Sequence, residues 1–246
     1  MARYKLILAY DGTAFEGSQR QARRRTVQGE LESALRELGW TGRAVTLAGR
    51  TDTGVHASGQ VAAFDLEWSQ GPDRLRSALN ARLPADLAVS DVQVAGEQFH
   101  PRFDAASRLY RYRLFCRQTR DPLRERYAWR VWPAPDGNRL NAIAKVFSGR
   151  HDFSAFGSPA REEGSTVRSV LRSKWKRFED EWQFDVRADA FLYRMVRRLV
   201  FVQVAVAQGR CSKEIVVKAL LKAKSKNELP AGLAPAHGLT LVDVAY

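Results

Sequence analysis

Hydrophobic and polar residues alternate with a period of two along eight segments of the chain, as in β-strands with one buried face. These segments are residues 4–10, 44–48, 60–65, 87–95, 108–116, 170–178, 182–188 and 239–245. A helical period appears in residues 26–38, where Thr26 stands at the N-cap position and one face carries Val27, Leu31, Ala34, Leu35 and Leu38. Further helices are expected over residues 72–82, 139–148, 190–208 and 213–224.

The order of these elements is β-α-β-β-α-β up to about residue 96, and it repeats from about residue 108 with one extra helix. This order is that of a split βαβ unit used twice. We therefore expect an α+β protein with two halves, residues 1–105 and 106–246. Their antiparallel sheets could join edge to edge into one mixed, mainly antiparallel sheet, with helices on one face and a broad groove on the other.

Composition excludes several classes of protein. The longest apolar stretch, residues 199–207, is too short to cross a bilayer, which needs about 20 apolar residues, so we expect a soluble protein without a membrane span. The only cysteines are Cys116 and Cys211, with no C-x-x-C spacing, which fits a reducing cytoplasm and no disulfide framework. The four histidines are scattered and predict no zinc site.

The formal net charge of +13 is unevenly distributed. Residues 1–105 hold 13 basic and 13 acidic residues, whereas residues 106–246 hold 27 basic and 14 acidic ones. Many arginines stand beside aromatic residues, as in the segment 110–113, Tyr-Arg-Tyr-Arg. Guanidinium groups bind phosphates and aromatic rings stack on unpaired bases, so this half suits a polyanion such as RNA. A solvated basic surface and ordinary strand alternation are the competing interpretations.

Candidate chemistry lies in residues 48–57, Ala-Gly-Arg-Thr-Asp-Thr-Gly-Val-His-Ala, between two expected strands. The chain contains no dinucleotide-binding, P-loop or nucleophile-elbow motif. Asp-Thr-Gly is typical of a tight turn. The loop is nevertheless longer than a hairpin needs, and it carries the carboxylate of Asp52, the guanidinium of Arg50 and the imidazole of His56. From the residues alone, a structural turn and a functional loop both remain open.

The segment G-R-T-D-T-G-V-H-A-S-G-Q-V resembles the signature of the tRNA pseudouridine synthase A family. Other motifs of that family follow in the expected order and cover essentially the whole chain: Tyr10-Asp11-Gly12-Thr13 with Gly17 and Gln19-Arg20-Gln21, Thr26-Val27-Gln28, Asn80 with Leu83-Pro84, Phe99-His100-Pro101-Arg102-Phe103, Arg108 with Tyr110 and Tyr112, Asp152-Phe153, Phe191 with Met195-Val196-Arg197, and Pro235-Ala236 with Gly238-Leu239.

The resemblance implies two ferredoxin-like halves, a cytoplasmic homodimer, and a basic cleft that holds the anticodon stem-loop of tRNA. The implied reaction breaks the N1–C1′ bond of uridine, turns the uracil and rejoins it through C5, so no cofactor is expected. Asp52 is implied as the catalytic carboxylate, either as a nucleophile or as a base at C2′ on a glycal route. The sequence leaves both routes open.

The other site residues also come from the resemblance. Arg197 is implied to pair with Asp52 and keep it ionised, and Tyr110 to stack on the target base and help remove the C5 proton. Arg50 is implied to contact the extruded nucleotide. His56 belongs to the same loop and suits a structural role better than acid–base chemistry. Phe191, Met195 and Leu239 are implied to form an apolar wall, although core packing, a phosphate contact for Arg197 and a plain cross-strand role for Tyr110 are the structural alternatives.

Three positions depart from the family pattern. Ser18 stands where a tryptophan is usual, Phe201 where a glycine is frequent, and Thr53 where an alanine is common. We expect Ser18 to change how the substrate is held and Phe201 to change the packing of its helix. Two competing functions remain: an RNA-binding protein on the same scaffold that modifies nothing, and a Mg²⁺-dependent nuclease that uses Asp11, Asp52 and Asp65.

Overall fold

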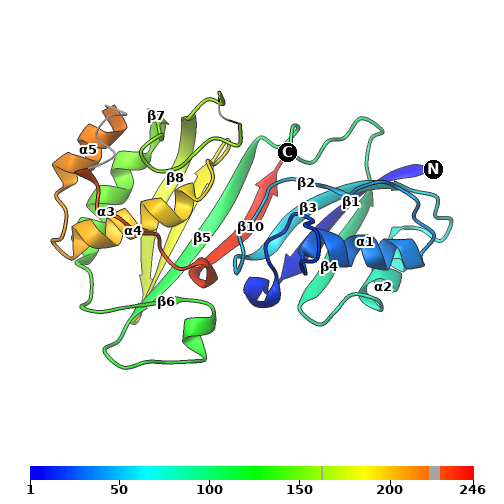
Figure 1. Cartoon of the computed structure of the whole chain (residues 1–246), viewed down its shortest axis with the longest axis horizontal. Coiled ribbons are helices and arrows are strands. Elements are labelled where there is room, and N and C mark those ends of the chain that lie inside the picture. The colour runs from blue at the N-terminus through cyan, green and yellow to red at the C-terminus, as the bar shows by residue number, and fades with distance from the viewer. Residues whose placement is uncertain (162, 222–227) are drawn as a thin grey trace. The chain divides into compact units, whose positions relative to one another are not determined.

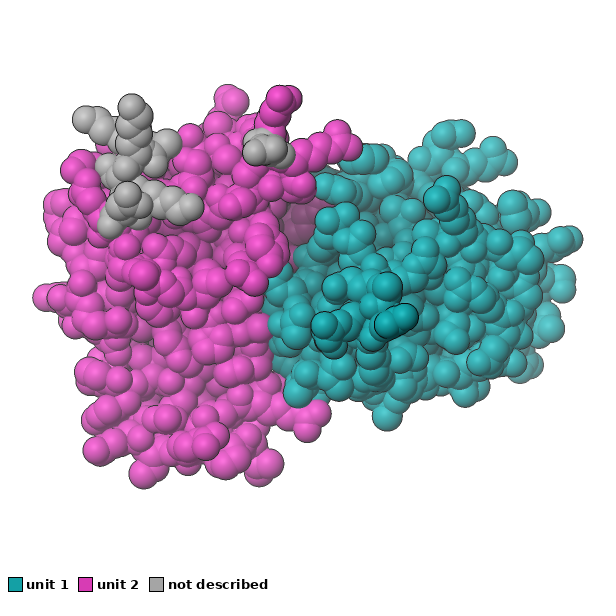
Figure 2. Space-filling model, viewed as in Figure 1, with its two compact units in different colours: residues 1–106, 240–246 teal, residues 107–239 magenta. Residues whose placement is uncertain are grey.

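The computed structural model describes residues 1–161, 163–221 and 228–246. The chain forms two compact units, which Figure 2 colours separately: unit 1 comprises Met1–Ala106 with Thr240–Tyr246, and unit 2 comprises Ser107–Leu239. The sequence-based division assigned all of residues 106–246 to the second half. The last seven residues instead belong to unit 1, because the final strand pairs with a strand of that unit.

Unit 1 has the expected order of strands and helices (Figure 1). Its elements are β1 (Ala2–Tyr10), the short 3₁₀ helix η1 (Gly12–Ala14), α1 (Val27–Glu37), β2 (Thr46–Leu47), β3 (His56–Leu66), α2 (Pro72–Asn80) and β4 (Leu87–Val94). Their sheet runs β4-β1-β3-β10, with β2 also beside β3. All pairs are antiparallel except that of β3 with β10 (Leu239–Ala245), which is parallel.

Alternation along β1 shows why this sheet has one buried face. Tyr4, Leu6, Leu8 and Tyr10 are buried, and the residues between them are partly exposed. Helix α1 turns a buried apolar face towards the core, and the hydroxyl of Thr26 caps it by accepting a hydrogen bond from the Gly29 N–H at 3.2 Å. The helix predicted over residues 26–38 is therefore confirmed, with its cap.

Unit 2 contains more elements than the sequence predicts. They are β5 (Ser107–Cys116), η2 (Arg124–Arg126), β6 (Trp129–Val131), α3 (Gly137–Ala144), η3 (Lys145–Phe147), β7 (Gly149–Asp152), β8 (Val167–Phe178), β9 (Glu181–Ala188), α4 (Met195–Ala207), α5 (Lys213–Leu221) and η5 (Ala236–Gly238). The sheet of this unit runs β5-β9-β8-β7, with β6 parallel to β5. The α+β class and the predominance of antiparallel pairs are confirmed.

The helices of unit 2 cover one face of its sheet. Tyr112, Phe184 and Trp175 occupy paired positions on β5, β9 and β8, and all three are buried. The indole N–H of Trp175 donates to the side-chain oxygen of the buried Gln203 on α4 at 2.8 Å. Helices α3 and α4 pack on one another, and α3 also contacts β8 (Figure 1). This face is therefore the core of unit 2.

The main differences from the predicted elements lie in unit 2. Strands β6 and β7 were not expected; at three and four residues they are too short to show a period. The helix predicted over residues 190–208 begins only at Met195, because Arg194 has a left-handed backbone with φ 62° and Tyr193 forms a bridge with Ser158. Residues 222–224 of the helix predicted over 213–224 lie outside the described residues.

Close approach of β10 to β3 predicts the effect of a substitution at Gly59. A Cβ atom at Gly59 would lie 2.2 Å from the carbonyl oxygen of Val242 on β10. We expect Gly59→Ala to lower the free energy of unfolding by about 2 kcal/mol, because the strand must move to admit the methyl group. Chemical denaturation measures the change. The exposed neighbour serves as the control: Ser58→Ala should change stability by less than about 0.5 kcal/mol, and equal effects at both positions would contradict the prediction.

Candidate active site

The loop between β2 and β3 ends in a tight turn with Asp52 at its first position. The backbone N–H of Val55 donates to the carbonyl oxygen of Asp52 at 3.1 Å. Gly54 has φ 77°, the left-handed conformation that the third residue of a type II turn requires. The turn predicted from Asp-Thr-Gly is therefore present, and it places the candidate carboxylate at the corner of a rigid loop.

Thr51, immediately before Asp52, is held at all three of its polar groups. Its N–H donates to Oγ of Ser18 at 2.8 Å, and its carbonyl oxygen accepts from the Ser18 N–H at 3.1 Å. Its Oγ1 lies 2.9 Å from the hydroxyl of Tyr10, within hydrogen-bonding distance. Thr51 is buried, whereas Arg50 is exposed and Asp52 partly exposed. The loop therefore turns Thr51 inward and leaves the two charged residues on its outer side.

His56 is a buried support of this loop. Its Nδ1 accepts a hydrogen bond from the Gly12 N–H at 2.9 Å and lies 3.2 Å from Oδ1 of Asp11. A ring nitrogen that accepts from a backbone N–H is not available as a base at that atom. Asp11 also accepts from the Thr13 N–H at 3.0 Å and so caps η1. These contacts tie the start of β3 to the turn after β1.

In unit 2, Tyr110 on β5 packs against Phe191. The two rings stand edge to face, with centroids 5.1 Å apart and an interplanar angle of 85°. Tyr110 pairs with Val186 of β9, so its side chain lies on the same face as Tyr112, which is the face covered by helices. This aromatic pair therefore lies on the helix side of its sheet, and the RNA-binding groove expected on the opposite face stays a prediction.

Arg197 lies in the first turn of α4. Its Nε donates to the carbonyl oxygen of Ala234 at 2.8 Å. Burial raises the pKa of Tyr112 well above its ordinary value, and the positive charge of Arg197 acts in the opposite direction, so the guanidinium lies near this ring. Arg194 and Arg198 flank the same helix end, which carries no acidic residue in its first turn. Cations are unfavourable at the positive end of a helix dipole, so this end of α4 is suited to an anion.

The structure brings some of the predicted site residues together. Tyr110 and Phe191 are in contact, and Met195 and Leu239 are buried residues of the same unit. Arg50, Asp52 and His56 belong to unit 1. The ion pair between Asp52 and Arg197 stays a prediction.

Two kinds of feature are missing from the described residues. Among residues 1–161, 163–221 and 228–246, no group of three or more His, Cys, Asp or Glu side chains could hold a metal ion. Within the same ranges no helix is both long and apolar enough to span a membrane. Asp65, which the nuclease alternative requires, pairs with Arg3 at 3.0 Å, and Asp11 caps η1. These two aspartates therefore have structural partners of their own.

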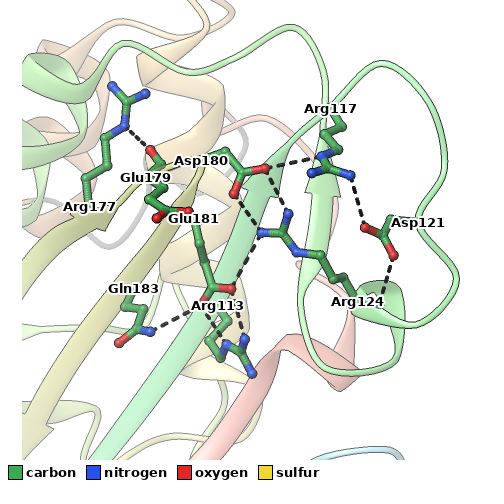
Figure 3. A network of polar contacts seen from close by, with 9 residues as sticks. All are labelled: Arg113, Arg117, Asp121, Arg124, Arg177, Glu179, Asp180, Glu181 and Gln183. Carbon is green, nitrogen blue, oxygen red and sulfur yellow. Dashed lines mark hydrogen bonds and ion pairs between the residues drawn. The ribbon is translucent and has the colours of Figure 1, made fainter.

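An ion-pair network in unit 2 anchors the segment after β5 to the β8–β9 hairpin (Figure 3). Arg124 forms two hydrogen bonds with Asp180, at 2.8 and 3.0 Å, and Arg113 forms two with Glu181, at 2.7 and 2.9 Å. The paired guanidinium of Arg124 lowers the pKa of Asp180. None of these residues belongs to the predicted site, so the network is a structural brace.

An open cavity of about 670 Å³ lies beside this network. Its lining includes Trp132, Trp182 and Arg177. None of the predicted site residues lines it. The cavity therefore gives no support to the candidate chemistry, which involves the Asp52 loop and the Tyr110–Phe191 pair.

Sequence reasoning missed the supporting role of Tyr10, Ser18 and Thr51. Tyr10 was visible as the last residue of an alternating strand and as part of a family motif, neither of which indicated its contact with Thr51. Ser18 was visible as a departure from the family pattern and was expected to change how the substrate is held, but it is 0% exposed and packs against the loop.

Phe201, the second departure from the family pattern, stacks on Trp129, with ring centroids 6.3 Å apart. A glycine at that position could not form this contact.

The chain is similar to known proteins over most of its length. A family model described as tRNA pseudouridine synthase matches residues 6–104 and 143–246. The chain is 39% identical to tRNA pseudouridine synthase A of Maridesulfovibrio salexigens, with 100% of this chain and 91% of that protein covered. It is 40% identical to the protein of the same name from a Geobacillus species, with 99% and 98% covered. One chain in a crystal structure of a Cbf5-Nop10-Gar1 complex is similar at a TM-score of 0.34 and 13% identity, covering 84% of this chain and 54% of that one, which supports no inference.

The buried phenol of Tyr10 predicts a pH dependence of stability. Burial raises the pKa of Tyr10 from 10.0 to about 12. The unfolded chain therefore ionises this group near pH 10 while the folded protein keeps it neutral, so the stabilisation is complete below about pH 10 and is lost between about pH 10 and pH 12.

Urea unfolding between pH 9 and 12 tests this effect on wild type and Tyr10→Phe. The free energy of unfolding of wild type should fall more steeply than that of the variant, by up to about 1.4 kcal/mol per pH unit within this window. Parallel curves would show that Tyr10 ionises equally easily in both states.

Proposed function

This chain belongs to the tRNA pseudouridine synthase family, whose members are isomerases, and from that premise we propose that it acts on uridines of the anticodon stem-loop with Asp52 as its catalytic carboxylate. The observation that carries the proposal is the conformation of the loop that contains Asp52. Asp52 stands at the corner of a tight turn, partly exposed, directly after a residue held by three polar contacts. Such a loop holds a carboxylate in one orientation without burying it.

The reaction needs one carboxylate near C1′ and no external reactant. The N1–C1′ bond breaks, the C5–C1′ bond forms, the proton leaves C5 and N1 gains one, so atoms and electrons balance within the nucleotide and solvent. Asp52 could attack C1′ as a nucleophile or take a proton from C2′ as a base. Its position at the outer side of the loop is compatible with either route.

Arg197 is the proposed partner of Asp52. The N-terminal end of α4 gathers three arginines, including Arg197, where the helix dipole disfavours cations. A carboxylate or phosphate at this end would offset that cost. A guanidinium beside Asp52 would also favour its ionised form in a site with little water and restrict its rotamer.

Tyr110 and its neighbours are proposed to receive the uracil ring. The edge-to-face pair of Tyr110 and Phe191 offers an aromatic surface, and Met195 and Leu239 extend it with apolar side chains that exclude water. The tyrosine hydroxyl is the proposed acceptor of the C5 proton. Arg50, exposed on the Asp52 loop, is proposed to contact the extruded nucleotide, and His56 to support the loop.

Charge in unit 2 supports a tRNA substrate. On the face of its sheet away from the helices, paired positions of β5, β9 and β8 carry a set of basic side chains: Arg111, Arg113, Arg187, Arg172, Lys174 and Lys176. Asp185 and Glu181 are interleaved with them, so positive charge predominates. This face is opposite the one that carries Tyr110, so its charge attracts a polyanion to unit 2, over a distance that depends on salt, without forming the proposed uracil site itself. By the same family resemblance, we propose that the protein acts as a homodimer in the cytoplasm.

The competing interpretations predict different behaviour. A binding protein that modifies nothing has no use for an acidic residue in a polyanion site, yet Asp52 stands at the corner of a loop that buried hydrogen bonds hold in place. A Mg²⁺-dependent nuclease needs its carboxylates together, whereas Asp11 and Asp65 have separate structural contacts.

Substitution of Asp52 tests the proposal directly. Tritium release from C5-labelled uridine in unmodified tRNA is measured in EDTA. We expect Asp52→Asn to lower the rate at least about a thousandfold, because the amide cannot serve as nucleophile or base, while tRNA binding is retained.

Asp65→Asn is the control, since it also neutralises a carboxylate in unit 1. It should keep the wild-type rate of tritium release. Full activity of Asp52→Asn, or loss of wild-type activity in EDTA, would contradict the proposed chemistry. Tight tRNA binding by wild type without any tritium release would favour the binding-protein alternative.

Tyr193 and Arg194 give a prediction about tRNA binding. They precede α4, Tyr193 is 54% exposed, and the Arg194 guanidinium lies 4.7 Å from the centre of its ring. We expect Arg194→Gln to weaken tRNA binding and to reduce the slope of log K against log salt by about 1, because one phosphate contact is lost. Binding is measured by filter retention at several salt concentrations.

Arg210 provides a matched control for this measurement. It follows the opposite end of α4 and also lies over an aromatic ring, that of Phe201, at 5.9 Å. Arg210→Gln should leave the slope unchanged. Equal changes for both variants would show that only the net charge matters.

A further inference from the structure

Ser18 is a fully buried polar residue that the proposed chemistry does not use. Its side chain is 0% exposed, and its hydroxyl oxygen accepts the N–H of Thr51 at 2.8 Å. Its own N–H donates to the carbonyl oxygen of Thr51 at 3.1 Å. One residue therefore satisfies both backbone groups of the residue that precedes Asp52.

The segment that carries Ser18 is itself anchored to α1. The carbonyl oxygen of Ser18 accepts from the Gln28 N–H at 3.0 Å, in the first turn of α1. Thr51 is held from the other side by Tyr10 of β1. The Gln60 side chain of β3 donates to the carbonyl oxygen of Gly49 at 2.9 Å and so holds the start of the loop. Contacts to β1, to β3 and to the segment anchored on α1 thus hold the loop, and Ser18 supplies the contact on the α1 side.

We propose that Ser18 is a positioning residue for Asp52: its hydroxyl fixes the Thr51 peptide, and through it the direction of the carboxylate. The proposal rests on the proposed function of Asp52. A side chain without an acceptor atom could not bind the Thr51 N–H, so the hydroxyl of Ser18 is what allows this residue to hold the loop.

Loss of the hydroxyl should affect catalysis more than binding. Without its acceptor, the buried Thr51 N–H must find another partner, and the loop must shift to allow this. A displacement of about 1 Å between a catalytic group and the reacting atom can reduce the rate about a hundredfold. Arg194 and the basic face of unit 2 remain unchanged, so affinity for tRNA should not fall.

The experiment measures tritium release and tRNA affinity for Ser18→Ala, which removes one oxygen atom and adds no bulk. We expect kcat to fall between about tenfold and a hundredfold, with KM and the dissociation constant for tRNA within about twofold of wild type. Ser18→Thr keeps the hydroxyl and should retain kcat within about threefold. All rates are compared well below the midpoint of thermal unfolding of each variant.

Asn80→Ala is the matched structural control. The Asn80 side chain also pairs with both backbone groups of one residue, Val89, at 2.8 Å for each bond, but away from the Asp52 loop. It should lower the unfolding temperature and leave kcat unchanged. If Ser18→Ala does not yield folded protein, Ser18→Cys is measured instead, and kcat must then fall at least about fivefold because a thiol is a weak acceptor.

The outcomes separate this inference from the proposed function. Wild-type kcat in Ser18→Ala together with an inactive Asp52→Asn would overturn the positioning role and leave Asp52 catalytic. A loss of tRNA affinity at unchanged kcat, or an equal loss of kcat in Asn80→Ala, would also overturn it. Full activity of Asp52→Asn would overturn the proposed function and the inference that rests on it.

Discussion

The contact between residues 11–18 and the loop 48–55 is the constraint on which the candidate site depends. Ser18 and Thr51 exchange two hydrogen bonds, and His56 accepts a third from the Gly12 backbone. These groups are buried, so each unsatisfied partner would cost about 1–3 kcal/mol. A loop fixed in this way holds the backbone on both sides of Asp52 through contacts of the neighbouring residues.

The second constraint is electrostatic and lies at the start of α4. An ordinary helix places acidic residues in its first turn, whereas this helix places Arg197 there and two further arginines beside it. Arg197 and Arg198 donate to backbone carbonyl oxygens of residues 230–234, which offset part of this unfavourable interaction. Trp175 and Gln203 secure the middle of the same helix to the sheet, so the cations at its end are held in place by packing.

Much of the fold could be predicted because it depends on local periodicity. The alternating strands and the capped helix after Thr26 appear where the pattern predicts them. The predictions were less successful where a tertiary contact overrides the local pattern. Arg194 adopts a left-handed backbone and Tyr193 pairs with Ser158, which delays α4 by five residues relative to the predicted start. The final strand lies in unit 1 because parallel pairing with β3 depends on a partner distant in sequence.

The sequence by itself determined the class of protein, the order of strands and helices in unit 1, the excess of positive charge and the family, since these follow from composition, period and motif. It also identified Asp52 as the candidate carboxylate through resemblance. Only the tertiary structure decided which residue Ser18 binds. A serine in a loop belongs to no periodic pattern, and its partner Thr51 lies 33 positions away. The tertiary structure likewise decided that Tyr110 packs on the helix side of its sheet, since that depends on the register between β5 and β9. Contacts between distant segments are set by packing, and packing cannot be read from any single stretch of chain.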